Sequence, residues 1–247
     1  MKRFLRLLKI EFSLNIRDMN MAIFAIIMPI VVLVILGFIY GGKPAFPDAP
    51  YTFLEQSFGA VSVIAICAGG LMGLPIVIAD YREKKILKRF KVTPIHPAML
   101  LGVELAIYIL YCIISLISLA IIASLFWQVI LHGSFWGFIG SWFLTMISTL
   151  SIGLLVGGIA KNAKQASIIA SLLYFPMLIF SGTTLPFEVM PEVMQKIVSF
   201  FPLTQGINLM KNSFLGIENT NLWLPITIMS VITIICTTLS IKFFKWE

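Results

Sequence analysis

The chain has 247 residues, of which 59% are hydrophobic and 12% are charged, and its mean hydropathy is +1.00. Soluble domains carry about 25% charged residues, so this composition excludes a soluble globular protein and indicates an integral membrane protein. The net charge of +7 would favour nucleic acid in a soluble chain, but here it fits cationic loops beside a membrane, and we expect no nucleic-acid partner. The three cysteines lie in apolar runs without metal-binding spacing and are expected to be buried hydrophobic residues.

The first 18 residues mix basic and large apolar side chains. This pattern predicts an amphipathic helix in the membrane interface, with a solvated basic leader as the alternative. No small-residue cleavage site follows, so we expect no cleaved signal peptide. Residues 21–40 are apolar over about the 20 residues that a crossing requires and form the first predicted span. An outer loop with three prolines is expected over residues 41–55.

Five more apolar runs predict an all-α membrane protein with six transmembrane helices. They cover residues 58–79, 98–127, 135–159, 167 to about 181, and 222–244. Glycines in the second span favour close helix packing, with a hinge or a pore-lining break as the alternative. Glu104 in the third span is a functional candidate, although a structural pair with a nearby Lys or Arg is favoured. His132, between the third and fourth spans, is expected to be a solvated surface group.

A dense run of charge, residues 80–97, separates the second and third spans, and we call it the charged strip. Its six basic and two acidic residues exclude it from hydrocarbon, so it must face water. As a helix over 82–92 it would place three apolar side chains on one side: Ile86, Leu87 and Phe90. The residue before a proline avoids the helical region, so the helix should stop at Thr93–Pro94. Physics alone leaves open whether this strip docks in a partner protein or binds anionic lipid headgroups.

Residues 182–221 are rich in proline and carboxylates and differ from the rest of the chain. One short helix should start at Pro191 and end at Pro202, and a second should run from about Thr204 to Phe214. Each is too short for a crossing, which suits re-entrant helices that rest on protein at the outer surface.

The distribution of Lys and Arg predicts the orientation of the chain. Fifteen of the 18 fall on the side of the two termini and the charged strip, so we expect that side to be cytoplasmic. The expected location is the cell membrane, with multiple crossings and both termini inside the cell.

The sequence contains no pattern typical of an active site. Phosphate-binding GxxxxGK[ST], HExxH and GxSxG patterns are absent from it, and the two histidines suggest no metal cluster. We therefore expect no catalytic residue, bound cofactor or metal in this chain. Because the spans hold almost no ionisable groups, energy for any transport should come from another polypeptide.

Two motifs together make the chain resemble the membrane subunit of a type-2 ATP-binding-cassette exporter, the family of daunorubicin- and lantibiotic-exporter permeases. The family pattern R-E-x-G-T-L-x-R-L-x-x-T-P is matched at Arg82, Glu83, Leu87, Arg89, Thr93 and Pro94. It differs at Lys85, where glycine is usual, and at Ile86 and Phe90. A second pattern, S-G…L-P…P…P-L, is matched at Ser181, Gly182, Leu185, Pro186, Pro191, Pro202 and Leu203.

The resemblance implies a single permease domain over residues 1–247 with three special segments. Residues 1–18 would be an interfacial connecting helix, 80–97 a cytoplasmic coupling helix, and 182–221 an extracellular hairpin that caps the exit. The implied ATPase-coupling residues are Arg82, Glu83, Ile86, Leu87, Arg89, Phe90, Thr93 and Pro94. The implied gate residues are Pro186, Pro191 and Pro202.

The resemblance also implies partners and cargo. Two copies of a separate ATPase, which bind ATP and magnesium, would drive two permease chains, identical or homologous, in contact with membrane lipids. The cargo would be an amphiphilic drug, antibiotic, peptide or lipid. The alternatives are a stand-alone channel or transporter, and a non-transporting membrane sensor or assembly protein.

Overall fold

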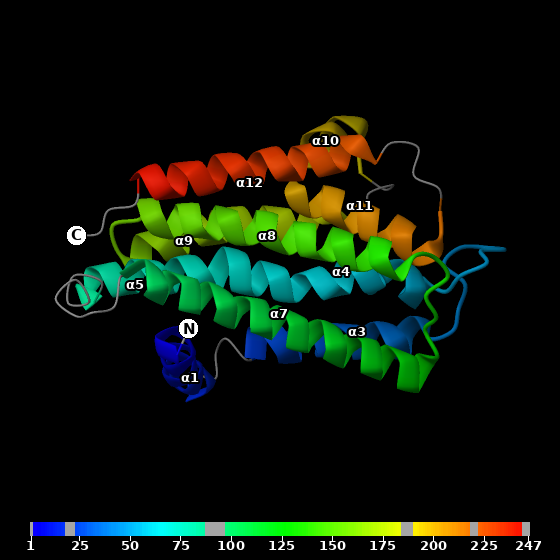
Figure 1. Cartoon of the computed structure of the whole chain (residues 1–247). Coiled ribbons are helices and arrows are strands. Elements are labelled where there is room, and N and C mark those ends of the chain that lie inside the picture. The colour runs from blue at the N-terminus through cyan, green and yellow to red at the C-terminus, as the bar shows by residue number, and fades with distance from the viewer. Residues whose placement is uncertain (1, 18–22, 87–96, 184–189, 218–221, 244–247) are drawn as a thin grey trace.

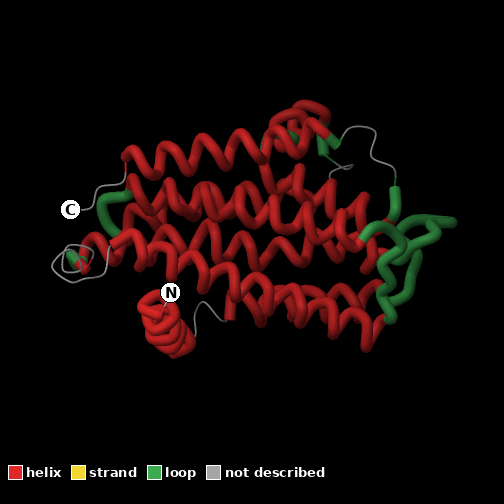
Figure 2. Tube along the Cα trace, viewed as in Figure 1, coloured by secondary structure: helices red, strands yellow, loops and turns green. Residues whose placement is uncertain are grey.

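Helices run side by side along most of the chain (Figure 1). The computed structural model describes residues 2–17, 23–86, 97–183, 190–217 and 222–243. Within these ranges an isolated bridge between Pro44 and Thr52 is the only β-type pairing, and helices and loops form the rest (Figure 2). The helices in chain order are α1 (Lys2–Arg17), η1 (Ile23–Ile27), α3 (Met28–Tyr40), α4 (Phe53–Cys67), η2 (Ala68–Gly73), α5 (Leu74–Glu83), α7 (Pro97–Trp127), α8 (Phe135–Ile159), α9 (Ala163–Leu178), η3 (Ile179–Thr183), α10 (Glu192–Val198), α11 (Pro202–Leu215) and α12 (Trp223–Phe243), where η marks a π-helical segment.

The prediction of six spans is confirmed. Six stretches are long and apolar enough to cross a membrane: Ile23–Tyr40, Phe53–Glu83, Ala98–Trp127, Phe135–Ile159, Ala163–Ser181 and Trp223–Phe243. The fifth starts earlier than expected, because the Asn162 side chain accepts a hydrogen bond from the Gln165 amide and caps the helix there.

The second span is longer than the sequence suggested at both ends. Helix α4 begins at Phe53 because Thr52 and Glu55 form a reciprocal capping box, so the expectation of a loop through Glu55 is wrong. Helix α5 continues to Glu83, so residues 80–83 of the charged strip are helical. The span formed by α4, η2 and α5 is also the core of the bundle, because 83% of its most apolar 18-residue stretch is buried.

Close backbone contacts hold this central span against α8. A Cβ on Gly153 would collide with the Gly70 carbonyl oxygen, and one on Gly157 would lie 2.9 Å from Ile78 Cβ. The glycines of the second span and of α8 therefore let two backbones approach, as the packing interpretation predicted. Helices α3 and α7 lie on one side of the central span, and α8 and α12 lie on the other (Figure 1).

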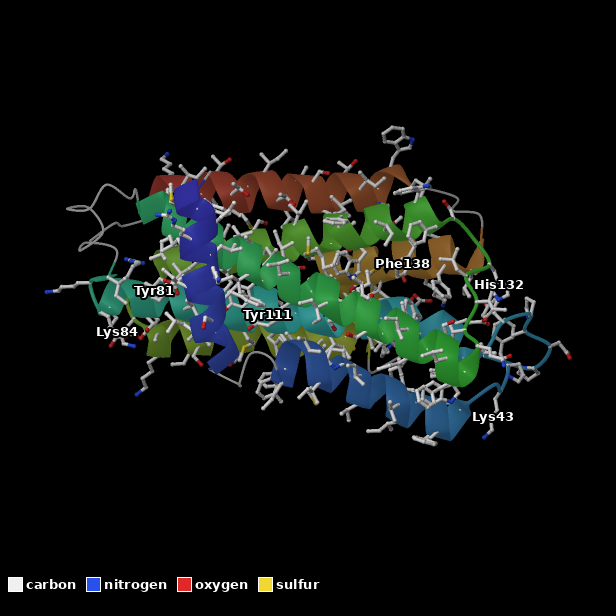
Figure 3. All side chains as sticks on the ribbon, turned by 60° about the horizontal axis from the view of Figure 1, so that its bottom comes forward. Lys43, Tyr81, Lys84, Tyr111, His132 and Phe138 are labelled. Carbon is white, nitrogen blue, oxygen red and sulfur yellow. The ribbon has the colours of Figure 1, made fainter. Side chains whose placement is uncertain are left out.

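Helix α1 lies across the spans rather than along them, near the end of the bundle where α5 ends (Figures 1 and 3). Leu7 is buried, and the Phe12 ring is 6.1 Å from the Tyr111 ring of α7, centroid to centroid. Leu5, Ile10 and Leu14 stay exposed. The predicted helix is confirmed over Lys2–Arg17, and its location in the membrane interface stays a prediction.

The segment before the last span forms two short helices, α10 and α11, as predicted. Pro202 does not end the first helix, which stops at Val198, but opens the second, because proline suits the first turn of a helix. Helix α11 packs against α4, α8 and α12, and ends at Gly216 with a left-handed φ of 71°. A Cβ on Gly206 would collide with the Thr145 side chain, so the first half of α11 lies near the middle of α8.

Candidate coupling site

The start of the charged strip is the end of a span, and its side chains reach neighbouring helices. Helix α5 carries the strip through Glu83, a turn follows, and residue 86 is the last one described before the gap. Three of the predicted coupling residues can therefore be placed: Arg82, Glu83 and Ile86. The other five, Leu87, Arg89, Phe90, Thr93 and Pro94, lie outside the described residues.

Arg82 points into the protein rather than toward water. The residue is 9% exposed, and its Nη1 donates to three backbone carbonyls at the end of α8: Gly158 at 2.7 Å, Ala160 at 2.8 Å and Gly157 at 3.3 Å. The last carbonyls of a helix lack partners within the helix and carry the negative end of its dipole. Arg82 supplies both the donors and the positive charge that this terminus needs. The expectation that residue 82 faces water is therefore wrong.

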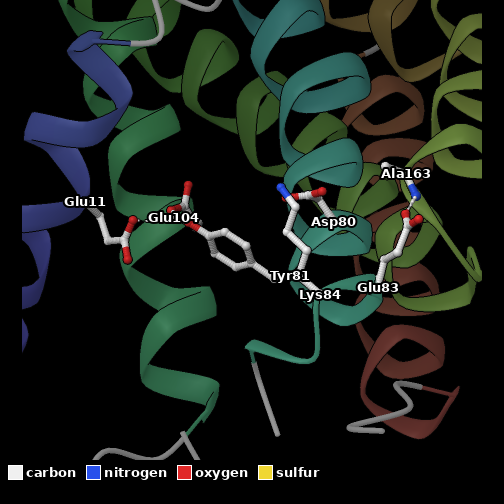
Figure 4. Close-up of polar contacts among 7 residues, drawn as sticks. All are labelled: Glu11, Asp80, Tyr81, Glu83, Lys84, Glu104 and Ala163. Atoms are coloured by element: carbon white, nitrogen blue, oxygen red, sulfur yellow. Dashed lines mark hydrogen bonds and ion pairs between the residues drawn. The ribbon is translucent and has the colours of Figure 1, made fainter. Parts of the chain in front are cut away.

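Glu83 makes the complementary contact one residue later. Its Oε2 accepts a hydrogen bond of 3.0 Å from the backbone amide of Ala163, which is the first residue of α9 (Figure 4). A carboxylate is favourable at a helix N-terminus because the dipole there is positive. Lys84 instead folds back onto Asp80 at 2.8 Å, and this hydrogen bond raises the pKa of the exposed Lys84 amine. Ile86 is partly buried beside the core.

Lys85 adopts a left-handed backbone conformation, with a φ of 55°. The Cβ atom makes this region unfavourable, whereas glycine, which has no Cβ, enters it freely. The family pattern that the strip resembles has glycine at this position. The turn that ends α5 therefore puts Lys85 in a strained conformation that glycine would adopt without strain.

A second polar group joins α1, α5 and α7 beside the strip (Figure 4). The Tyr81 hydroxyl lies 2.9 Å from Glu104 Oε1 and 3.1 Å from Glu11 Oε2, and Glu104 is fully buried. One hydroxyl hydrogen serves one carboxylate at a time, so the second contact requires a protonated carboxyl group that donates to the hydroxyl oxygen. Among the described residues no Lys or Arg is paired with Glu104, and the expected basic partner stays a prediction.

The opposite end of the bundle is joined by Glu55. Glu55 is 5% exposed. Its Oε2 accepts a hydrogen bond of 2.7 Å from the Thr52 amide. Its Oε1 accepts one of 3.1 Å from the Ile130 amide and also lies 3.1 Å from His132 Nε2. The His132 and Gly133 amides also donate to the Phe214 carbonyl of α11. The His132 side chain is 40% exposed, which confirms the expectation of a surface group, and it also bridges to Glu55. Figure 3 shows His132 and Lys84 at opposite ends of the bundle.

The three predicted gate prolines are not brought together by the described structure. Pro191 precedes α10 and is exposed, Pro202 opens α11 and is buried, and Pro186 lies outside the described residues. Their predicted role stays a prediction.

Sequence reasoning missed the partners of the predicted residues. Two signals were present: the only acidic residue among the first seventeen, Glu11, and the glycine-rich end of the fourth span at Gly157–Gly158. In the described part of the chain, no three His, Cys, Asp or Glu residues gather in a way that could hold a metal ion. The described charged groups of this site hold helices together, because Arg82 and Glu83 bind helix ends and do not surround a position for a reacting atom.

Comparison with known proteins gives similar sequences in a transport permease and in a nodulation protein. The chain is similar to the inner membrane transport permease YhhJ of Escherichia coli, with 27% identity over 52% of this chain and 34% of that protein. It is also similar to nodulation protein J of Rhizobium leguminosarum, with 27% identity over 37% of this chain and 36% of that protein. The matches thus span about a third of each of these relatives. The sequence profile of the ABC-2 type transporter family matches residues 2–215, and the chain belongs to this family of membrane transport proteins.

Proposed function

We propose that this chain is the membrane-spanning subunit of an exporter that a separate ATPase drives. The observation that carries the proposal is the charged strip in a member of the ABC-2 family: it connects two spans directly, and its first residues bind the ends of two more. A partner that pulls or rotates this strip would act on four spans at once. The chain itself is then a non-catalytic subunit, and ATP and magnesium bind to the ATPase.

The charges at the two ends of the bundle support a cytoplasmic location of the strip. Lys84 and Lys85 lie at the end of α5, and Lys161, Lys164 and Lys242 lie at helix ends on the same side of the bundle (Figures 1 and 3). The described cations of the other end are Lys43, Lys196 and Lys211. Positive charge concentrates on the cytoplasmic side of membrane proteins, so the proposed orientation puts both termini and the strip inside the cell.

The proposed transporter pairs two permease chains, identical or homologous, with two ATPases. The proposed cargo is amphiphilic: a drug, antibiotic, peptide or lipid. The spans that contain α3, α9 and α12 each bury only about a fifth of their most apolar 18-residue stretch within this chain. This exposure supports pairing with a second chain or contact with lipid. Apolar surfaces of this kind accept lipid, a second chain or an apolar cargo.

Docking through the strip is tested by co-purification of this chain with a co-expressed candidate ATPase of the ATP-binding-cassette type. Replacing Leu87 and Phe90 with Asp removes the predicted apolar ridge, so we expect loss of the ATPase and normal membrane insertion. Lys84→Gln is the matched control, because Lys84 contacts Asp80 within its own helix. Unchanged co-purification of the double variant would contradict docking through this helix. ATPase stimulation by candidate compounds in the intact complex would then identify the cargo.

A further inference from the structure

We propose that Arg82 and Glu83 are positioning residues that fasten the charged strip to the connection between α8 and α9, so that α5, the end of α8 and the start of α9 move as one body. This inference rests on the proposed function, in which a partner moves the strip. It differs from the role that the family resemblance implies, where both residues would contribute to ATPase coupling directly.

The first reason is the burial and direction of Arg82. A residue that is 9% exposed offers little surface to a partner, and its Nη1 already donates to three carbonyls. Two hydrogens on that nitrogen serve the two shorter contacts, to Gly158 and Ala160, and the longer one to Gly157 is shared. Nη1 of the guanidinium is therefore committed to the end of α8.

The second reason is that consecutive residues bind opposite helix ends. Arg82 meets the C-terminus of α8, and Glu83 meets the N-terminus of α9 at Ala163. Only residues 160–162 separate these two helices. A cation at a helix C-terminus and an anion at a helix N-terminus are both favourable, so the pair matches both dipoles at one short connection.

The third reason is that small residues leave little room for sliding beneath this pair. Ala79 of α5, Ala160 of the connection and Ala166 of α9 are fully buried against one another. A Cβ on Gly157 would lie 3.1 Å from Pro75 Cα. Elements packed this closely have little freedom to slide past one another.

The backbone changes direction immediately beyond the pair. Lys85 has a φ of 55°, and the helix ends there. The break in helical geometry thus lies outside the fastened body and on the side of the predicted docking residues. Movement of the docking residues would reach the bundle through Arg82 and Glu83.

The test measures distances between spin labels in the complete complex with its ATPase, before and after the ATPase is trapped with nucleotide and vanadate. One label pair joins Lys84 to Lys242 and reports the strip, and the other joins Lys164 to Lys242 and reports the start of α9. All three lysines are exposed. The native cysteines are replaced, and the background is accepted only if it retains ATPase activity.

In the wild-type background we expect both distances to shift on trapping. In Glu83→Ala the strip distance should still shift and the α9 distance should lose its shift, whereas Glu83→Gln, which keeps an acceptor for the Ala163 amide, should behave as wild type. Arg82→Met should have the same effect as Glu83→Ala: the strip distance should shift on trapping and the α9 distance should not. Because the Glu83 contact is exposed, Glu83→Ala decides the matter even if Arg82→Met does not fold.

An α9 shift of wild-type size in Glu83→Ala would overturn the inference. A complex in which neither distance shifts in the wild-type background, or from which the ATPase is absent, would instead contradict the proposed function. The two failures are therefore distinguishable.

Discussion

The two ends of the central span are joined to their neighbours in different ways. At the start of α4, the buried carboxylate of Glu55 gathers two backbone amides and His132. At the end of α5, Arg82 and Glu83 divide the work and bind two different helix termini. At the first end all of these contacts converge on one side chain, whereas at the second end two consecutive residues of the charged strip each bind a different helix. The first arrangement suits a fixed end, and the second suits an end that must pass on movement.

The largest expected loss follows from Arg82→Met. Three carbonyls at the end of α8 lose their donor, and an unsatisfied buried polar group costs about 1–3 kcal/mol, so we expect a loss of about 3 kcal/mol in unfolding free energy. Arg82→Lys keeps the charge and should lose less. Thermal unfolding in detergent measures both variants, and equal melting temperatures for Met and Arg would show that this end is not held as described.

A somewhat smaller loss is expected at the other end from Glu55→Ala. The substitution removes the Glu55 half of the capping box and leaves the Thr52 and Ile130 amides without their acceptor, which together should cost about 2 kcal/mol. Glu55→Gln keeps one acceptor oxygen, so its unfolding free energy should lie between those of wild type and Glu55→Ala. If Glu55→Ala is as stable as wild type in the same melting experiment, the contrast between the two ends disappears.

Tyr81→Phe probes the polar group beside the strip. Loss of the hydroxyl removes the hydrogen-bond partner of buried Glu104 and should cost about 1.5 kcal/mol. Glu104→Gln should be close to neutral, because an amide can donate to the hydroxyl oxygen as a protonated carboxyl does. Equilibrium unfolding of the two variants separates these outcomes, and a Glu104→Gln loss as large as that of Tyr81→Phe would argue for an ionised carboxylate.

The smallest expected effect is a gain. Lys85→Gly relieves a left-handed conformation that costs a non-glycine residue about 1 kcal/mol, so the variant should unfold at a slightly higher temperature. Lys84→Gly, at a neighbouring residue without a positive φ, is the control and should not stabilise. A destabilising Lys85→Gly would mean that the strip does not turn at this residue.

The sequence predicted the parts of this fold that depend on long apolar runs and on proline and glycine. All six spans and the pair of short helices before the last one follow from such signals. It could not predict that Arg82 would be buried, because a charged residue in a charged run reads as solvated until its distant carbonyl partners are known. The Glu55–His132 contact has the same origin, since residues 77 apart in sequence meet only through the packing of spans.

The π-helical segment η2 lies in the middle of the central span, between the part held by Glu55 and the part held by Arg82. Such a segment accommodates one residue more than an α-helical turn, so removing a single residue there would restore regular winding. An α-helix turns by about 100° per residue, so one residue inserted with regular winding would rotate every later side chain by that angle around the helix axis. The wider turn of η2 absorbs the surplus residue locally, so the second half of the span keeps the angular phase in which Arg82 faces α8.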